Sequence, residues 1–128
     1  KLRTIYKLEV LRSSTGMNAI FFRAPSIKKY RELDRKLRER IQAFCLDHVR
    51  AVVAALRPKQ IVVIGFEAMR LFDPGQADLF AAKGRVLTIS GVVAGCPALA
   101  VLHLTGCRIA ADDRSKIAAR LSGQIQSD

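Results

Sequence analysis

Apolar residues form short runs that are typical of buried strands. Ile61–Ile64 is a continuous apolar stretch bounded by Gly65, and Ala98–His103 is a second stretch that ends on a polar residue. Runs of this kind suit strands that are buried on both faces, as in a parallel sheet. Residues 18–22 and 86–90 are predicted as two further strands.

A long helix is predicted between residues 26 and 56. Ser26 is a suitable N-cap, and Arg57-Pro58 ends the helix because proline disfavours helical backbone in the residue before it. Apolar residues recur mostly at three- and four-residue steps, which predicts one stripe on a helix of about seven turns. The stripe comprises Leu33, Leu37, Ile41, Phe44, Leu46, Val49, Val52, Val53 and Leu56. Acidic residues are interleaved with the basic ones of the outer face, so much of this charge is expected to pair along the helix.

The remaining segments are shorter. Residues 66–72 are predicted as a helix, residues 76–82 as a further helical turn, and residues 91–97 as a loop of small residues. Asp112 or Asp113 caps a closing helix. Residues 1–12 fit either a helix end or a strand.

This order of elements predicts the fold class. Strands alternate with helices, so we expect an α/β domain with a three-layer α/β/α arrangement and a mostly parallel central sheet. The 128 residues fit a single domain. Ligands of such sheets bind outside the carboxyl ends of the strands. Those ends are predicted near Arg23, Gly65, Ser90 and His103.

Charge narrows the class of partner. The chain has 22 Lys and Arg against 11 Asp and Glu, a net charge of +11. An excess this large on a small domain points to a polyanion, most simply nucleic acid, with an anionic membrane surface as the weaker option.

Cysteine spacing and hydropathy bear on the compartment. The three cysteines have no C-x-x-C spacing, which argues against a disulfide framework and a thiolate zinc site. We expect a reducing compartment, cytoplasmic or nuclear. No apolar run is long enough to span a bilayer.

His103 is the first candidate for chemistry. An imidazole at the carboxyl end of a buried strand can donate a hydrogen bond to developing negative charge. The alternative is a structural histidine bonded to a loop. His48, in the middle of the long helix, is expected to be structural because no partner is in view.

Asn18 and Phe66 are candidates for reading a base. An asparagine amide carries both a donor and an acceptor, so it can pair with a base edge, although closing its own turn is the commoner role of such a residue. Phe66 follows the strand-terminal Gly65 and could stack on a base, with core packing as the default. Arg108 could meet a phosphate or belong to a solvated charged face. No glycine-rich phosphate-binding motif occurs, so we expect no nucleotide cofactor.

Three stretches together resemble the uracil-DNA glycosylase superfamily. Residues 15–23, T-G-M-N-A-I-F-F-R, look like its T-N-x-v-x-x-R strand, and residues 56–68 resemble its helix followed by P-k-x-i-v-x-l-G-x-x-A. Residues 101–106, V-L-H-L-T-G, fall where the family carries H-P-S at a strand end. The match covers residues 13–122, nearly the whole chain.

The resemblance implies a DNA substrate, base flipping and hydrolysis of the base–sugar bond. By position, Asn18 matches the residue that reads the uracil edge, and His103 matches the histidine that stabilises charge on the departing base. Leu104, Thr105 and Arg108 match the loop that contacts or wedges into DNA. The partner implied is uracil-containing DNA, single- or double-stranded, with no membrane.

This sequence departs from the family pattern in three ways. The water-activating loop expected upstream of Asn18 is not seen in residues 1–12, so we expect a C-terminal portion of a longer domain. Leu104-Thr105 stands in place of Pro-Ser. Only Cys45 lies near a cluster-ligand position, so no iron–sulfur cluster, no metal and no other cofactor is expected. Two alternatives stay open: a non-catalytic nucleic-acid-binding domain of the same fold, and an unrelated α/β domain that binds another anionic partner.

Overall fold

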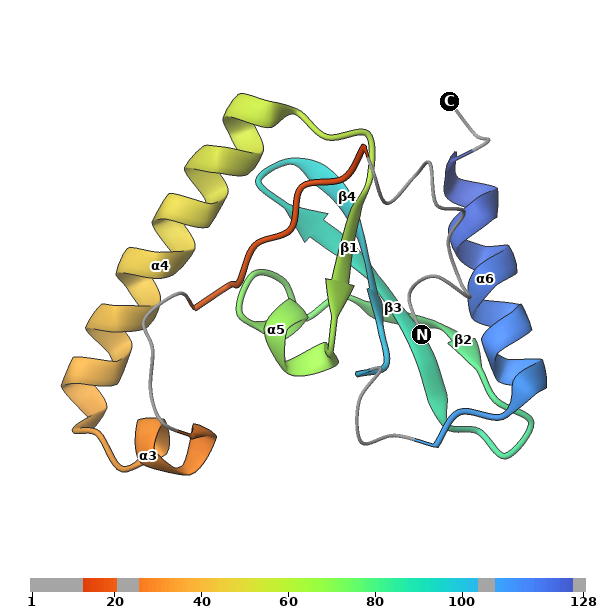
Figure 1. Cartoon of the computed structure of the whole chain (residues 1–128), viewed down its shortest axis with the longest axis horizontal. Coiled ribbons are helices and arrows are strands. Elements are labelled where there is room, and N and C mark those ends of the chain that lie inside the picture. The colour runs from red at the N-terminus through yellow and green to blue at the C-terminus, as the bar shows by residue number, and fades with distance from the viewer. Residues whose placement is uncertain (1–12, 21–25, 104–107, 126–128) are drawn as a thin grey trace.

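A mixed sheet forms the centre of the molecule. The computed structural model describes residues 13–20, 26–103 and 108–125, and of residues 124 and 125 it describes the backbone alone. The four strands are β1 (Ile61–Ile64), β2 (Gln76–Phe80), β3 (Val86–Val93) and β4 (Cys96–Val101), in the order β1-β4-β3-β2 (Figure 1). β1 is parallel to β4, whereas β3 is antiparallel to both β4 and β2. The described fold is therefore α/β, and its sheet is mixed. The prediction of a mostly parallel sheet is wrong.

A tight turn explains the antiparallel pairing. Val93 pairs with Cys96, so only Ala94 and Gly95 connect β3 to β4. Both have positive φ, 49° and 78°, which is the signature of the two-residue turn that matches the twist of a hairpin. A connection this short joins only antiparallel strands. The loop expected over residues 91–97 is consequently a strand end, a turn and the start of β4.

β2 replaces the helical turn expected over residues 76–82. Ala77 and Leu79 are partly buried and alternate with the more exposed Gln76, Asp78 and Phe80. This is the two-residue period of a strand at a sheet edge. The Asp73 carboxylate accepts hydrogen bonds from the Gly75 N–H at 3.0 Å and the Val92 N–H at 2.9 Å. These two bonds fix the loop before β2 against β3.

The long helix is divided in two. The Ser26 hydroxyl accepts a hydrogen bond from the Lys29 N–H at 3.2 Å and caps α3 (Ile27–Arg31). Asp34 then caps α4 (Arg35–Leu56) by accepting from the Lys36 and Leu37 N–H groups. This second N-cap accepts hydrogen bonds from the first N–H groups of a new helix. The prediction of a single uninterrupted helix is therefore wrong. The end before Pro58 is confirmed, because α4 stops at Leu56.

Helices cover both faces of the sheet. On one face, Val49 and Val53 of α4 pack with Met69 of α5 (Phe66–Arg70) against buried residues of β3 and β4. On the other face, Ile117 and Leu121 of α6 (Ala111–Ile125) pack against Leu87, Leu99 and Val101. Figure 1 shows α4 and α6 on opposite sides of the sheet.

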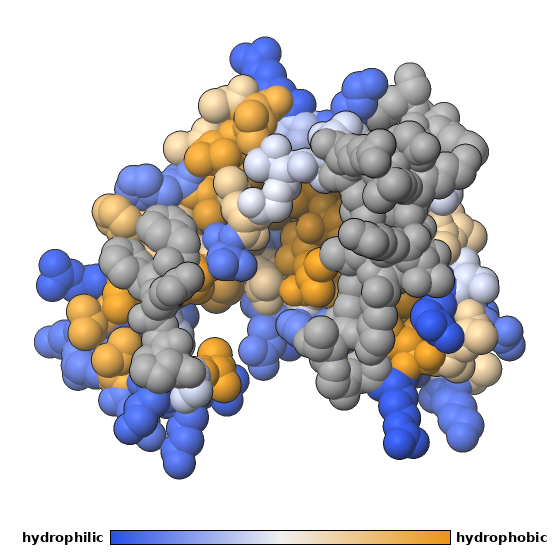
Figure 2. Space-filling view, in the orientation of Figure 1, coloured by the Kyte–Doolittle hydropathy of each residue, from blue (hydrophilic) through white to orange (hydrophobic). Residues whose placement is uncertain are grey.

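The apolar stripe of α4 is only partly used in this packing. Three stripe residues, Leu46, Val49 and Val53, are buried, together with Cys45 of the same helix. Leu37, Phe44 and Leu56 remain 43%, 48% and 57% exposed. In Figure 2, hydrophobic and hydrophilic residues consequently lie side by side over the α4 region at the left. Within the described part of the chain, no helix is long and apolar enough to cross a bilayer.

Candidate functional site

The carboxyl ends of β1 and β4 meet at one edge of the sheet. The two strands are parallel neighbours, and Ile64 and Val101 are paired at their last positions. Gly65 follows β1, and its N–H donates to the Val101 carbonyl at 2.9 Å. His103 follows β4 after the buried Leu102 and is exposed. The structure therefore brings Gly65 and His103 to the same edge, which we call the carboxyl edge.

Gly65 and His103 also lie close to one another. A Cβ atom placed on Gly65 would be 3.3 Å from Cδ2 of the His103 imidazole. Gly65 is itself buried and has φ 95°, a backbone conformation that favours glycine. The imidazole therefore lies over bare backbone at the point where β1 turns into α5.

Phe66 begins α5 directly after that turn. Its side chain is partly buried and packs against the apolar clusters of both sheet faces. In this position the ring contributes to both apolar clusters. This is the core packing expected as the default role of Phe66. Base stacking by its remaining exposed surface stays a prediction.

The other sequence candidates are less closely grouped. Asn18 is exposed and lies in the segment 13–20, whose residues 18–20 form no strand, so the predicted strand is wrong over that part. The rest of that predicted strand, like Leu104 and Thr105, lies outside the described residues. Arg108 is exposed, and its carbonyl accepts a hydrogen bond from the Arg85 guanidinium at 3.0 Å.

Ser90 is not at the carboxyl edge. It lies within β3, which runs antiparallel to β4, and its hydroxyl donates to the Asp78 carboxylate. The expectation that Ser90 marks a ligand-binding strand end is therefore wrong. The expectation assumed that β3 runs parallel to β4, which would have brought its carboxyl end to the same edge.

Ion pairs near the carboxyl edge are exposed. The Arg31 guanidinium of α3 lies 3.9 Å from the Glu67 carboxylate in the first turn of α5, and both side chains are more than 60% exposed. On α3 and α4, Lys29 pairs with Glu32 at 3.2 Å, and Arg35 pairs with Glu39 at 2.8 Å. Such pairs are screened by water and contribute little to stability. They confirm that interleaved charges partly pair along these helices.

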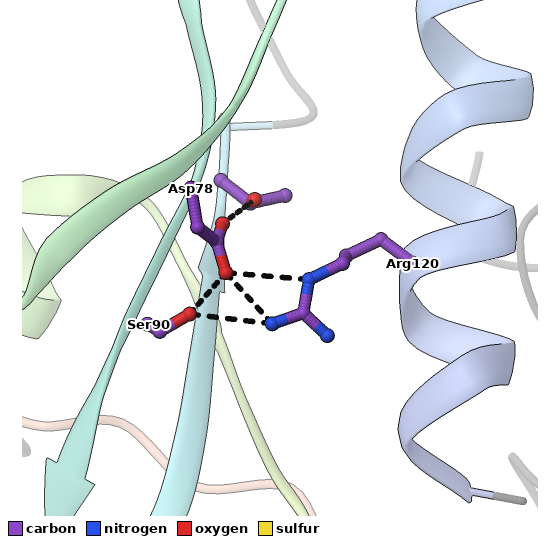
Figure 3. A network of polar contacts seen from close by, with 4 residues as sticks. Asp78, Ser90 and Arg120 are labelled. Carbon is purple, nitrogen blue, oxygen red and sulfur yellow. Dashed lines mark hydrogen bonds and ion pairs between the residues drawn. The ribbon is translucent and has the colours of Figure 1, made fainter.

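A second polar cluster lies on the α6 face of the sheet (Figure 3). The Asp78 carboxylate of β2 accepts hydrogen bonds from the Thr88 and Ser90 hydroxyls of β3. Arg120 of α6 donates to the same carboxylate from Nη2 at 2.7 Å and from Nε at 3.2 Å. We call these four residues the Asp78 network. Sequence reasoning missed it because Asp78 and Arg120 are 42 residues apart and neither belongs to a local motif.

Two carboxylates have perturbed acidity. Partial burial raises the pKa of Asp78, but the hydrogen bonds from Ser90, Thr88 and Arg120 outweigh it, so its pKa is lowered from 3.8. Backbone hydrogen bonds from Gly75 and Val92 lower the pKa of Asp73. Both groups are therefore held as carboxylates that stabilise the sheet and are not tuned toward acid–base work near neutral pH.

Metal ligation has little support in the described part of the chain. No group of three or more His, Cys, Asp or Glu residues there is arranged to hold a metal ion. Cys45 is buried in α4, and Cys96 is partly buried at the start of β4. Nδ1 of His48 lies 2.8 Å from the Phe44 carbonyl oxygen, and the centroids of the His48 and Phe44 rings are 4.2 Å apart, with the rings tilted by 36°. Such local contacts are expected for a structural histidine.

No family model, no curated protein and no solved structure matches the chain. The resemblance to uracil-DNA glycosylases is therefore carried by the motifs quoted above. A functional assignment depends on the geometry of the carboxyl edge.

Proposed function

We propose that the chain is a uracil-DNA glycosylase-like domain that hydrolyses the N-glycosidic bond of a flipped uracil or other damaged base. The observation that carries the proposal is the position of His103, exposed at the shared carboxyl edge of β1 and β4 and next to Gly65. Open α/β sheets bind ligands at such an edge. Helices on both faces of the sheet support a three-layer, glycosylase-like architecture.

The proposed chemistry uses His103 as a hydrogen-bond donor. When the base–sugar bond breaks, its electron pair goes to the base, and a water oxygen bonds to the sugar carbon. The water loses one proton, which the released base takes up through solvent. An imidazole N–H aimed at a base oxygen stabilises this negative charge in the transition state. Donors of this kind contribute mainly to the rate of the chemical step, because the charge is absent from the ground state.

The charge of the domain supports DNA as the partner. The net charge of +11 remains after the ion pairs are formed, since each pair uses one charge of either sign. Arg108 is exposed beyond β4, and Lys28 is exposed on α3, where they are available to phosphates. Phosphate contacts would give binding that weakens steeply with salt.

The test is release of uracil from labelled oligonucleotides, single-stranded and paired with guanine, followed by alkaline cleavage at abasic sites. The assay uses this chain and the complete gene product, and we expect cleavage by the complete product and strongly reduced cleavage when it carries His103→Ala. Equal cleavage with and without this substitution would remove His103 from the mechanism. No cleavage by either the chain or the complete product would contradict the proposed reaction.

A non-catalytic nucleic-acid-binding domain of the same fold is the second candidate. It is favoured by Asn18, the proposed reader of the base edge, which is exposed and belongs to no strand of the described sheet. This candidate predicts salt-dependent DNA binding without base release. Absence of DNA binding even at low salt would instead favour an α/β domain that binds another anionic partner.

A further inference from the structure

We infer that Gly65 is a positioning residue for His103: the lack of a side chain at residue 65 determines where the imidazole lies at the carboxyl edge. The structural part of this inference stands on the contact itself. Its consequence for rate rests on the proposed function.

The backbone at Gly65 is held from both sides. Its N–H donates to the Val101 carbonyl at 2.9 Å, and its carbonyl accepts from the Met69 N–H at 3.4 Å in α5. These bonds tie Gly65 to β4, the strand that leads to His103, and to the first turn of α5. Gly65 therefore cannot move away from the imidazole without breaking contacts of the sheet or the helix.

The space above Gly65 is tight for a methyl group. A Cβ there would lie 3.3 Å from His103 Cδ2, so the ring would have to give by a few tenths of an ångström. Because the ring belongs to an exposed residue, it can shift or turn more cheaply than the buried backbone beneath it. The expected result of adding a methyl group is a displaced imidazole in a folded protein.

Positive φ alone does not explain this contact. Gly65, Gly84 and Gly95 have φ of 95°, 83° and 78°, and the backbone conformation favours glycine at all three. A Cβ on Gly84 or Gly95 would meet no atom within 4 Å. Gly95→Ala is therefore a control for positive φ: it places a methyl group on a positive-φ residue of the β3–β4 turn without touching His103.

The direct test is by NMR, which needs no substrate. The chain has two histidines, so His103→Ala assigns the ring signals of both. We expect a nuclear Overhauser contact between the His103 Hδ2 and the Gly65 Hα protons in the wild type. We also expect the His103 Hδ2 signal to shift in Gly65→Ala, with His48 unchanged, and neither signal to shift in Gly95→Ala. Absence of the wild-type contact would overturn the inference even if Gly65→Ala did not fold, and so would an unshifted His103 signal in a folded variant.

The kinetic test measures uracil release for the same variants. Misplacing a reacting group by about 1 Å can cost about 100-fold in rate, so a smaller displacement is expected to lower kcat by about 10-fold with KM nearly unchanged. Gly95→Ala should keep the wild-type kcat. If the wild-type protein releases no base, the proposed function fails, whereas the NMR contact still decides whether Gly65 positions His103. An unchanged kcat in Gly65→Ala, with a shifted ring signal, would overturn the consequence for rate alone.

Discussion

The carboxyl edge and the Asp78 network both gather polar groups from distant segments, but they hold them differently. The Asp78 carboxylate is 24% exposed and accepts hydrogen bonds from two hydroxyls and one guanidinium. His103 is exposed and lies over the bare backbone of Gly65. A carboxylate that accepts hydrogen bonds from three side chains of a sheet and a helix stabilises the fold, whereas an exposed imidazole at strand ends can meet a ligand. The comparison therefore predicts that changes at the network affect stability and changes at the edge affect activity.

The largest effect is expected at the carboxyl edge. Replacing His103 by Ala removes the donor to the departing base, so single-turnover uracil release should slow by about 100- to 1000-fold. DNA affinity should stay within about twofold, because the lost interaction is made mainly in the transition state. Fluorescence anisotropy with the same oligonucleotide measures that affinity. A large loss of affinity would show that His103 binds DNA and does not act on the bond.

The next effect concerns how firmly the two helices are anchored. Ile117 of α6 is fully buried, so Ile117→Ala should lower the free energy of unfolding by about 2–5 kcal/mol. Phe44 of α4 is 48% exposed, and Phe44→Ala should cost about 1 kcal/mol or less. Urea unfolding of both variants checks this difference. Equal losses would mean that the exposed part of the α4 stripe is covered in solution.

A smaller loss of stability is expected at the Asp78 network. Arg120→Met removes the guanidinium from a partly buried carboxylate and should lower the free energy of unfolding by about 1–3 kcal/mol. Arg114→Met, at an exposed position of the same helix, is the control and should be nearly neutral. Uracil release by both variants should match the wild type. Slower release by Arg120→Met alone would link the network to the site and break the division between the two regions.

The smallest effect is the response to acid. The pKa of Asp78 is lowered in the folded protein, so its contribution is complete above the ordinary value of 3.8 and is lost as the pH falls through the lower folded value. The wild type should therefore lose more stability than Asp78→Asn between pH 5 and pH 3, limits set about one unit either side of that value. Urea unfolding at fixed pH steps measures this. Parallel curves for the two proteins would show that Asp78 contributes no stability of this kind.

The sequence predicted those elements whose signal is local. Ile61–Ile64 is a strand because four consecutive apolar residues end at a glycine, and α4 ends before Pro58 for the reason expected from proline. These two elements, with β4, are enough to locate Gly65 and His103. The central part of the candidate site was therefore predictable from residue pattern and the rule for strand ends.

Features that depend on turns and on distant partners were not predictable in this way. The small residues around Ala94 and Gly95 predicted a loop, whereas they form the turn of an antiparallel hairpin. The direction predicted for β3 relative to β4 was wrong for this reason. Gln76–Phe80 has only five residues. An alternation of apolar and polar positions over so short a segment does not distinguish a strand from a helical turn. The contact between Gly65 and the His103 ring joins residues that follow two different strands, and only the folded backbone reveals it.

The most direct test of the division between the two regions measures rate and stability on the same two variants. Single-turnover uracil release and thermal unfolding would be recorded for His103→Ala and Arg120→Met beside the wild type. The account predicts that His103→Ala releases uracil slowly and unfolds at the wild-type temperature. It predicts that Arg120→Met releases uracil at the wild-type rate and unfolds at a lower temperature. If His103→Ala releases uracil at the wild-type rate, the assignment of chemistry to the carboxyl edge is contradicted.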